Sequence, residues 1–166
     1  MPVLPILRWP DPRLSEPAAP VEAPDEAVRL LARDLLDTMR AAPGVGITGP
    51  HVGALRRVVV LDLPGDPTPA VYCDPRVVWA SDETARFVEG SVSMPGVTDE
   101  IERPARVRVA YLDIDGVARE EEAAGFRAAC LQHEIDQLDG VFWLRRLSRL
   151  RRERVVKKWD KLRRGA

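Results

Sequence analysis

The spacing of hydrophobic and polar positions predicts a helix early in the chain. Apolar residues recur there at helical intervals, at Val28, Leu31, Leu35, Leu36 and Met39. Pro24-Asp25-Glu26 precedes them, and acidic side chains are favourable at the helix end whose backbone amides are unpaired. Ala41-Ala42-Pro43-Gly44 then ends the pattern, so a first helix is predicted between these two signals.

After the Gly/Pro-rich segment that follows, the pattern changes to period two or to continuous β-branched runs, which are typical of strands. The predicted strands are Val58–Leu61, Ala70–Cys73, Val77–Trp79, Arg106–Leu112 and Val117–Glu122. The last two flank the turn Asp113-Ile114-Asp115-Gly116, which predicts a hairpin.

Two helical patterns close the sequence. Ala123–Leu138 places Phe126, Ala129, Cys130, His133 and Gln137 on one broad face, and Gly140 terminates it. A last helix, roughly Leu147–Leu162, carries a few apolar residues inside a basic shell. Because the strands precede the long helix, the predicted fold class is α+β.

The chain of 166 residues shows no internal repeat and no dividing linker, so one domain over residues 1–166 is expected. Residues 1–24 hold seven of the 15 prolines and are predicted to form an extended arm on that domain. No apolar run approaches the roughly 18–20 residues of a membrane span, and no signal peptide is visible. The two cysteines, Cys73 and Cys130, form no disulfide framework, so a cytoplasmic location is expected.

Charge is segregated along the chain although the formal net charge is only −1. Residues 145–166 hold eleven basic and two acidic residues, whereas residues 1–144 hold 14 basic and 24 acidic ones. This pattern predicts an acidic body with a basic C-terminal helix, and it suggests an anionic partner for that helix.

Three polar segments are candidates for chemistry. Gln132–Gln137, QHEIDQ, lies on the predicted long helix, where positions i and i+4 share a face and can hold one cation while the glutamate handles a proton. Position i+4 is a glutamine here, and an amide oxygen is a poor ligand for zinc or ferrous iron. Glu89–Gly96 is a loop with two hydroxyls, and Gly44–His51 contains three glycines that indicate close backbone approach. Each segment alone is also compatible with an ordinary polar helix or turn.

Taken together and in this order, the segments resemble the motifs of the peptide deformylase family. Deformylases carry GxGxAAxQ, EGCLS and QHExDHLxG, and this chain carries GVGITGPH, EGSVS and QHEIDQLDG at comparable spacing. The resemblance runs from ILRWPDPRL near the start to the terminal helix. It implies an α+β fold with mixed and antiparallel sheets around a central HExxH-type helix. The implied activity is hydrolysis of the N-formyl group from the N-terminal methionine of new polypeptides.

The resemblance also implies which positions form the site. The family's metal ligands, a cysteine and two histidines that bind ferrous iron or another divalent metal, fall on Ser91, His133 and Gln137. The glutamate that exchanges protons with the metal-bound water falls on Glu134. The glutamine that helps bind the developing oxyanion falls on His51, beside which the family uses a backbone amide that would be that of Val92. The substrate cleft falls on Gly44, Gly46, Glu89 and Gly90.

His133 is therefore the single family ligand that this chain retains. A neutral hydroxyl replaces a thiolate at Ser91, and a carboxamide replaces an imidazole at Gln137. A full zinc ligand set is worth on the order of 10–16 kcal/mol, so losing two of three protein ligands predicts weak binding of iron or zinc. We expect no firmly bound cofactor, and we expect ordinary metal-dependent deformylation to be lost or much reduced.

Three alternatives for the altered site remain open. His51, His133 and Glu134 could form a different His/His/carboxylate set and support an active hydrolase of formyl-methionyl or other N-acylated substrates. Ser91 could act instead as a nucleophile, with His133 or His51 as its base. Otherwise polar residues fill the old metal cavity with hydrogen bonds.

The resemblance suggests two partners and no membrane association. N-terminal peptides would bind in the inherited cleft. In bacterial deformylases the C-terminal extension contributes to ribosome docking, so the basic helix at residues 145–166 is a candidate site for ribosomal RNA or another polyanion. Its alternative interpretation is a solvated amphipathic helix.

Overall fold

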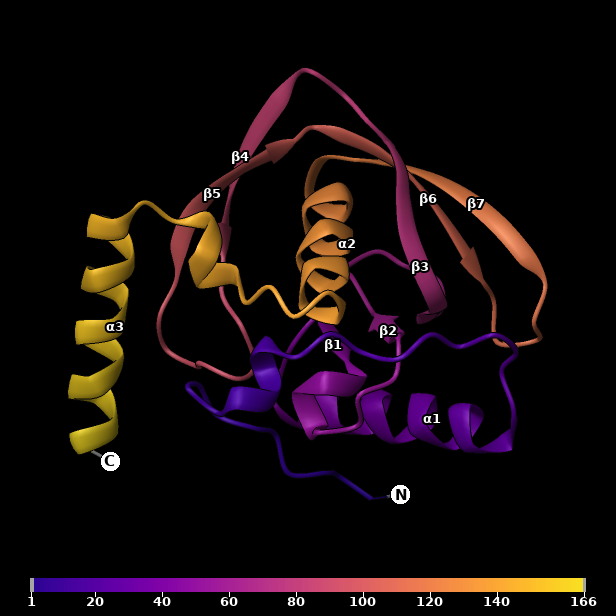
Figure 1. The fold of residues 1–166 in the computed structure, drawn as a ribbon, viewed down its shortest axis with the longest axis horizontal. Helices are drawn as coiled ribbons and strands as arrows, with labels where there is room; N and C mark the ends of the chain where they lie inside the picture. The colour runs from indigo at the N-terminus through magenta and orange to yellow at the C-terminus, as the bar shows by residue number, and fades with distance from the viewer. Residues whose placement is uncertain (1, 166) are drawn as a thin grey trace.

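The computed structural model describes residues 2–165, in which sheets wrap around a central helix (Figure 1). The helices are α1 (Glu26–Ala41), α2 (Gly125–Leu138) and α3 (Arg149–Arg164), with short 3-10 turns η1 (Pro12–Ser15), η2 (Gly49–Val52) and η3 (Trp143–Arg146). The strands are β1 (Gly46–Thr48), β2 (Val58–Leu61), β3 (Ala70–Ala80), β4 (Thr84–Glu89), β5 (Asp99–Pro104), β6 (Arg106–Leu112) and β7 (Ala118–Ala124).

The strands form two antiparallel arrangements around α2. One sheet has the order β1-β2-β3-β6-β7, and β4 pairs with β5 in a second, two-stranded sheet. The predicted α+β class with a central motif-bearing helix is confirmed. No helix among residues 2–165 is long and apolar enough to cross a membrane.

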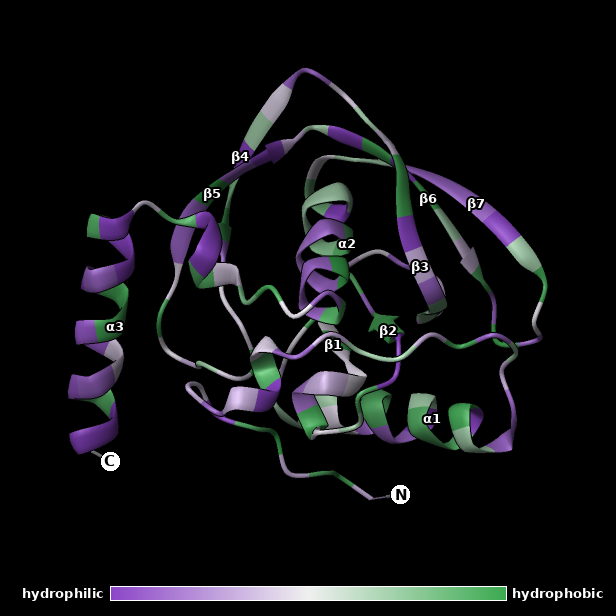
Figure 2. Cartoon of the chain, viewed as in Figure 1, coloured by the Kyte–Doolittle hydropathy of each residue, from purple (hydrophilic) through white to green (hydrophobic). Residues whose placement is uncertain are grey.

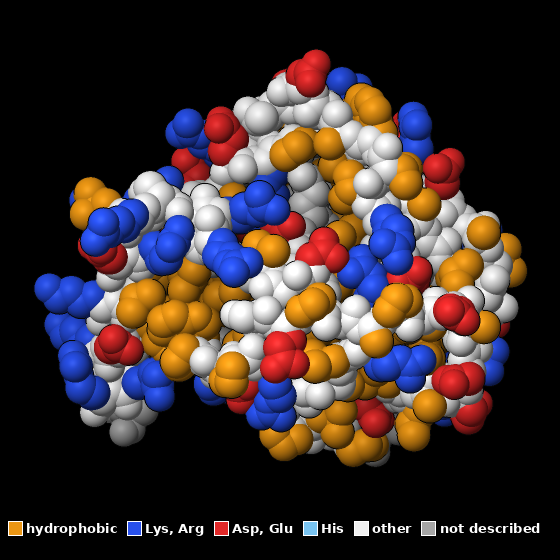
Figure 3. Space-filling model, in the orientation of Figure 1, with side chains coloured by type: hydrophobic (Ala, Val, Ile, Leu, Met, Phe, Trp, Pro, Cys, Tyr) orange, Lys and Arg blue, Asp and Glu red, His pale blue; other side chains and the backbone are white. Residues whose placement is uncertain are grey.

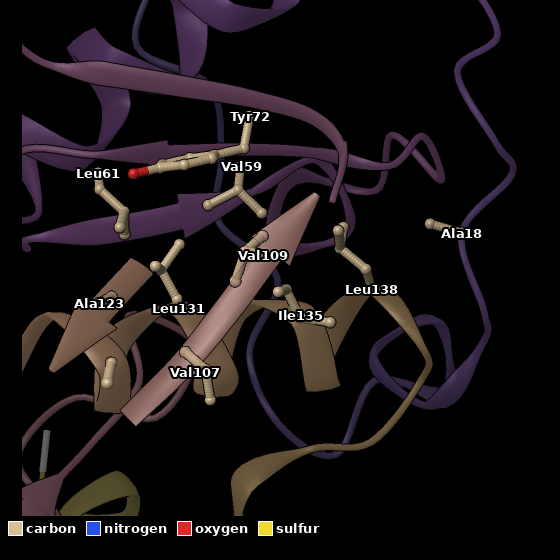
Figure 4. Packing of buried hydrophobic residues seen from close by; sticks show 11 residues of the cluster. Ala18, Val59, Leu61, Tyr72, Val107, Val109, Ala123, Leu131, Ile135 and Leu138 are labelled. Atoms are coloured by element: carbon tan, nitrogen blue, oxygen red, sulfur yellow. The ribbon is translucent and has the colours of Figure 1, made fainter. Parts of the chain in front are cut away.

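The apolar side of α2 holds the centre of the core. Leu131, Ile135 and Leu138 project from α2 toward Val59 on β2 and Val109 on β6 (Figure 4). All are buried, and burying such side chains contributes about 1.5–3 kcal/mol each. This packing fixes the rotation of α2 and places Glu134 against Gly46 on β1, the edge strand of the same sheet.

The strand predictions were incomplete. Ala70–Cys73 and Val77–Trp79 belong to one strand, β3, whose register shifts relative to β6 between Cys73 and Arg76 and again between Val77 and Trp79. β1, β4 and β5 were not predicted, and Glu89 ends a strand where a loop was expected. The strand β7 continues to Ala124, so α2 begins at Gly125.

The basic helix α3 packs on the side of the body through its few apolar residues (Figures 1 and 2). It begins at Arg149, after the Ser148 side chain caps it by accepting the Arg151 N–H. Val155 and Trp159 are buried in a cluster with Leu14, Met94, Val97 and other apolar residues. Lys and Arg side chains gather on the outer surface over α3 (Figure 3).

Candidate functional site

A cavity of about 280 Å³ lies beside α2 and collects most of the predicted site residues. Its walls come from α2, the end of β4, the loop after β4 and the segment around β1. The predicted residues that line it are Gly44, Gly46, His51, Glu89, Gly90, Ser91, Val92, His133 and Glu134. Gln137 does not line it.

The N-terminal arm holds two of these wall segments in place. The backbone N–H of Leu7 donates to the His51 carbonyl at 2.8 Å, and that of Trp9 donates to the Ser93 carbonyl at 3.0 Å. The Arg8 guanidinium donates to the Val92 carbonyl at 2.9 Å. Residues 7–9 therefore join two wall segments that are about forty residues apart in sequence.

His133 is fixed by a carboxylate rather than left free. Its Nδ1 lies 2.8 Å from Glu89 Oε1, and Arg103 contacts both Glu89 oxygens, at 2.6 and 2.9 Å. Burial alone would raise the pKa of Glu89, but the hydrogen bonds from His133 and Arg103 outweigh it and lower that pKa to about 2. Glu89 is thus ionised, and the hydrogen on the His133 ring lies on Nδ1.

Glu134 is buried at the cavity wall with an oxygen that has no partner. Its Oε1 makes no hydrogen bond among residues 2–165, and it lies 3.9 Å from His133 Nε2. Gly46 packs so closely on this carboxyl group that a Cβ there would overlap Glu134 Oε2. Burial raises the pKa of Glu134 to about 7, against the opposing effect of His133.

His51 presents a hydrogen-bond donor to the cavity. Its Nδ1 accepts the Thr48 backbone N–H at 2.9 Å, which leaves the ring proton on Nε2. Burial, followed by the charge of nearby His133, lowers the pKa of His51 to about 3, so the ring is neutral. Nε2 has no hydrogen-bond partner within the described part of the chain.

The two replaced ligand positions have different fates. Ser91 lines the cavity, where its Oγ accepts the Ser93 N–H at 3.1 Å. The Gln137 carboxamide instead donates to the Leu14 carbonyl of η1 at 2.7 Å and is 2% exposed. Gln137 therefore ties α2 to the N-terminal arm, which is a structural contact.

These donors do not fit a divalent metal of the family type. Ser91 offers a neutral hydroxyl, Gln137 is engaged with a backbone carbonyl, and His133 is the single imidazole left at the former ligand positions. Across residues 2–165, no three His, Cys, Asp or Glu side chains are grouped closely enough to hold a metal ion. The set of His51, His133 and Glu134 is therefore not assembled as a three-ligand site.

Sequence reasoning missed two polar residues behind the cavity. Arg103 on β5 lies in a segment without a strand signal, so nothing in the pattern placed it against Glu89. Asp136 lies within the QHEIDQ segment, and its Oδ2 accepts from Arg103 Nη1 at 2.8 Å. The sequence signal for Asp136 was its place between the motif residues His133 and Gln137, which could have marked it as part of the site.

Known proteins resemble this chain over nearly its full length. The family model described as Polypeptide deformylase matches residues 3–153. A "Peptide deformylase-like" protein of Brucella melitensis biotype 1 is 59% identical over 159 residues, covering 96% of this chain and 97% of the relative. A "Peptide deformylase" of Phenylobacterium zucineum is 45% identical over 159 residues, covering 94% of each. The crystal structure of peptide deformylase from Ehrlichia chaffeensis superposes with a TM-score of 0.93 at 36% identity, covering 99% of this chain and 98% of that one.

Proposed function

The chain belongs to the polypeptide deformylase family, and we propose that it keeps a cleft for N-terminal peptides while its ordinary metal-dependent hydrolysis is lost or greatly reduced. One observation carries this proposal. The Gln137 carboxamide, at a family ligand position, is buried against the Leu14 carbonyl instead of lining the cavity. A neutral carboxamide held in this way supplies neither the negative charge of a thiolate nor the imidazole nitrogen that zinc and iron sites use.

The cavity retains groups that match the amide of a formylated or other N-acylated peptide. His51 Nε2–H is a donor for a carbonyl oxygen, and Glu134 Oε1 is an acceptor for an amide N–H. Both atoms are buried and lack partners, so a ligand that satisfies them gains more than it would at a solvated site. These two groups support peptide binding without turnover.

A serine mechanism has less support. A nucleophilic hydroxyl needs a base within hydrogen-bond reach, about 2.6–3.2 Å. The Ser91 hydroxyl contacts the Ser93 N–H, His133 Nδ1 is engaged with Glu89, and His51 Nδ1 accepts from Thr48. No histidine nitrogen among the described residues makes a hydrogen bond with Ser91, so we favour the binding role over the Ser91 hydrolase.

The basic helix α3 supports a second part of the proposal, binding of ribosomal RNA in the cytoplasm. Several of its cations form no ion pair within residues 2–165, and these are Arg152, Arg154, Lys157, Lys158, Lys161, Arg163 and Arg164. Lysine and arginine side chains that face solvent without acidic partners are suited to phosphate contacts.

The test is partial restoration of the family ligands. The variant Ser91→Cys/Gln137→His should bind more metal and hydrolyse a formyl-methionyl peptide faster than the natural chain, in which we expect little of either. Ser93→Cys/Gln137→His is the matched control, because Ser93 does not line the cavity. Equal metal content and turnover in the natural chain and the Ser91 variant would contradict the proposal.

A further inference from the structure

A series of charged contacts links the basic C-terminal segment, residues 145–165, to His133. Arg146, in η3, contacts both Asp136 oxygens, with Nε–Oδ2 at 2.9 Å and Nη2–Oδ1 at 2.8 Å. Asp136 Oδ2 also accepts from Arg103 Nη1 at 2.8 Å. Arg103 holds Glu89 through two hydrogen bonds, and Glu89 accepts from His133 Nδ1.

Exposure is high at the Arg146 end of this series of contacts and low at its inner members, including His133, which is 11% exposed. The Arg146 side chain is 49% exposed and Asp136 is 14% exposed. Arg103 and Glu89 are 6% and 7% exposed. The outer pair can therefore be reached from solvent, whereas the inner contacts at the cavity wall are shielded from water.

The charges of the four connected groups balance. Glu89 and Asp136 carry two negative charges, and Arg103 and Arg146 carry two positive ones. When Arg146 is removed, Asp136 has only Arg103 as a cationic partner and draws it away from Glu89. Glu89 is then less neutralised, and its hydrogen bond with His133 Nδ1–H becomes stronger.

We propose that Arg146 is a positioning residue for the cavity, acting on His133 through Asp136, Arg103 and Glu89. A phosphate group of RNA bound to the basic segment takes Arg146 from Asp136 and thereby changes the hydrogen bond of His133. This coupling rests on the proposed RNA binding for its trigger, whereas the positioning role of Arg146 does not. RNA binding at the basic segment thereby changes the hydrogen bond between Glu89 and His133 at the cavity wall.

The test uses the natural chain without a cavity ligand. The protein has two histidines, so the ring NMR signals of His133 can be assigned with a His51→Gln variant. Arg146→Gln should shift the His133 Nδ1 proton downfield and slow its exchange with water roughly threefold, in keeping with a half-exposed ion pair. Arg146→Lys should restore part of the natural signal.

Arg145→Gln is the matched control. Arg145 is the adjacent residue of the same 3-10 turn, is exposed, and makes no side-chain ion pair among residues 2–165. It loses the same charge as Arg146→Gln but should leave the His133 signal unchanged. Equal His133 signals in the two variants, or a signal unchanged by Arg146→Gln in a folded protein, would overturn the positioning role.

A second measurement adds an oligouridine RNA to the natural chain and to Arg146→Gln. Saturating RNA should move the His133 signal of the natural chain toward that of the variant, and it should leave the variant's signal in place. RNA that binds without moving His133, or RNA that does not bind, overturns the coupling. The His133 signal is measured without a peptide, so these results do not depend on whether the cavity binds peptides.

Discussion

The contact between Gln137 and Leu14 gives the most direct structural prediction. Replacing Gln137 by Met keeps a side chain of similar size but removes the amide donor. The Leu14 carbonyl then loses its 2.7 Å hydrogen bond from Gln137 in a region where Leu14 is fully buried. This variant tests the structural role of Gln137 separately from metal binding.

The expected loss follows from the burial of both partners. Leaving a buried acceptor without its donor costs about 1–3 kcal/mol. For a domain of this size, each kcal/mol lowers Tm by about 2–4 °C. Gln137→Glu should be less stable than Gln137→Met, because a buried carboxylate would then face the Leu14 carbonyl.

Equilibrium urea unfolding at neutral pH, with metal chelator present, measures these differences. The predicted order of stability is the natural chain, then Gln137→Met, then Gln137→Glu. A Met variant as stable as the natural chain would refute the structural role of Gln137. A Glu variant more stable than the Met variant would refute the explanation through the Leu14 carbonyl.

Three further predictions follow from the cavity and the helix α3. Gly46→Ala should destabilise the protein by about 1–3 kcal/mol, because the alanine Cβ would overlap Glu134 Oε2. In thermal melts, the same Gly46→Ala change should lower Tm less when Glu134 has been replaced by Ala. Burial raises the folded-state pKa of Glu134 to about 7, so its ionisation costs no stability below pH 4.5 and costs progressively more as the pH rises to 7. In urea titrations, Glu134→Gln should therefore raise the free energy of unfolding at pH 8 by on the order of 3 kcal/mol and give no gain at pH 4. Replacing Lys157, Lys158 and Lys161 by Gln should weaken binding of an oligouridine RNA and reduce the slope of log K against log salt by about 2, whereas an unchanged slope would reject a phosphate interface on α3.

The fold could be predicted where sequence periodicity was strong. The first helix shows five apolar residues at helical spacing between clear start and stop signals, and β6 begins with alternating arginine and valine residues. The strands β4 and β5 escaped prediction because they pair mainly with each other and expose much of their surface. Their segments, TARFVE and DEIERP, therefore carry many polar residues and no clear apolar face.

The site was predicted from motif letters rather than from periodicity. The motifs predicted that His51, Ser91, His133 and Glu134 belong to one site, and in the structure all four line one cavity. They could not show that Gln137 faces the Leu14 carbonyl, because that contact joins residues 123 positions apart. Such long-range contacts depend on the packed fold.

The central claim is that the family's metal site no longer exists in this chain. Its most direct test is the metal bound per chain after incubation of the natural protein with iron or zinc and removal of free ions, measured together with turnover of a formyl-methionyl peptide. We predict far less than one metal ion per chain and negligible turnover. One tightly bound ion per chain, with turnover that Glu134→Ala abolishes, would contradict it.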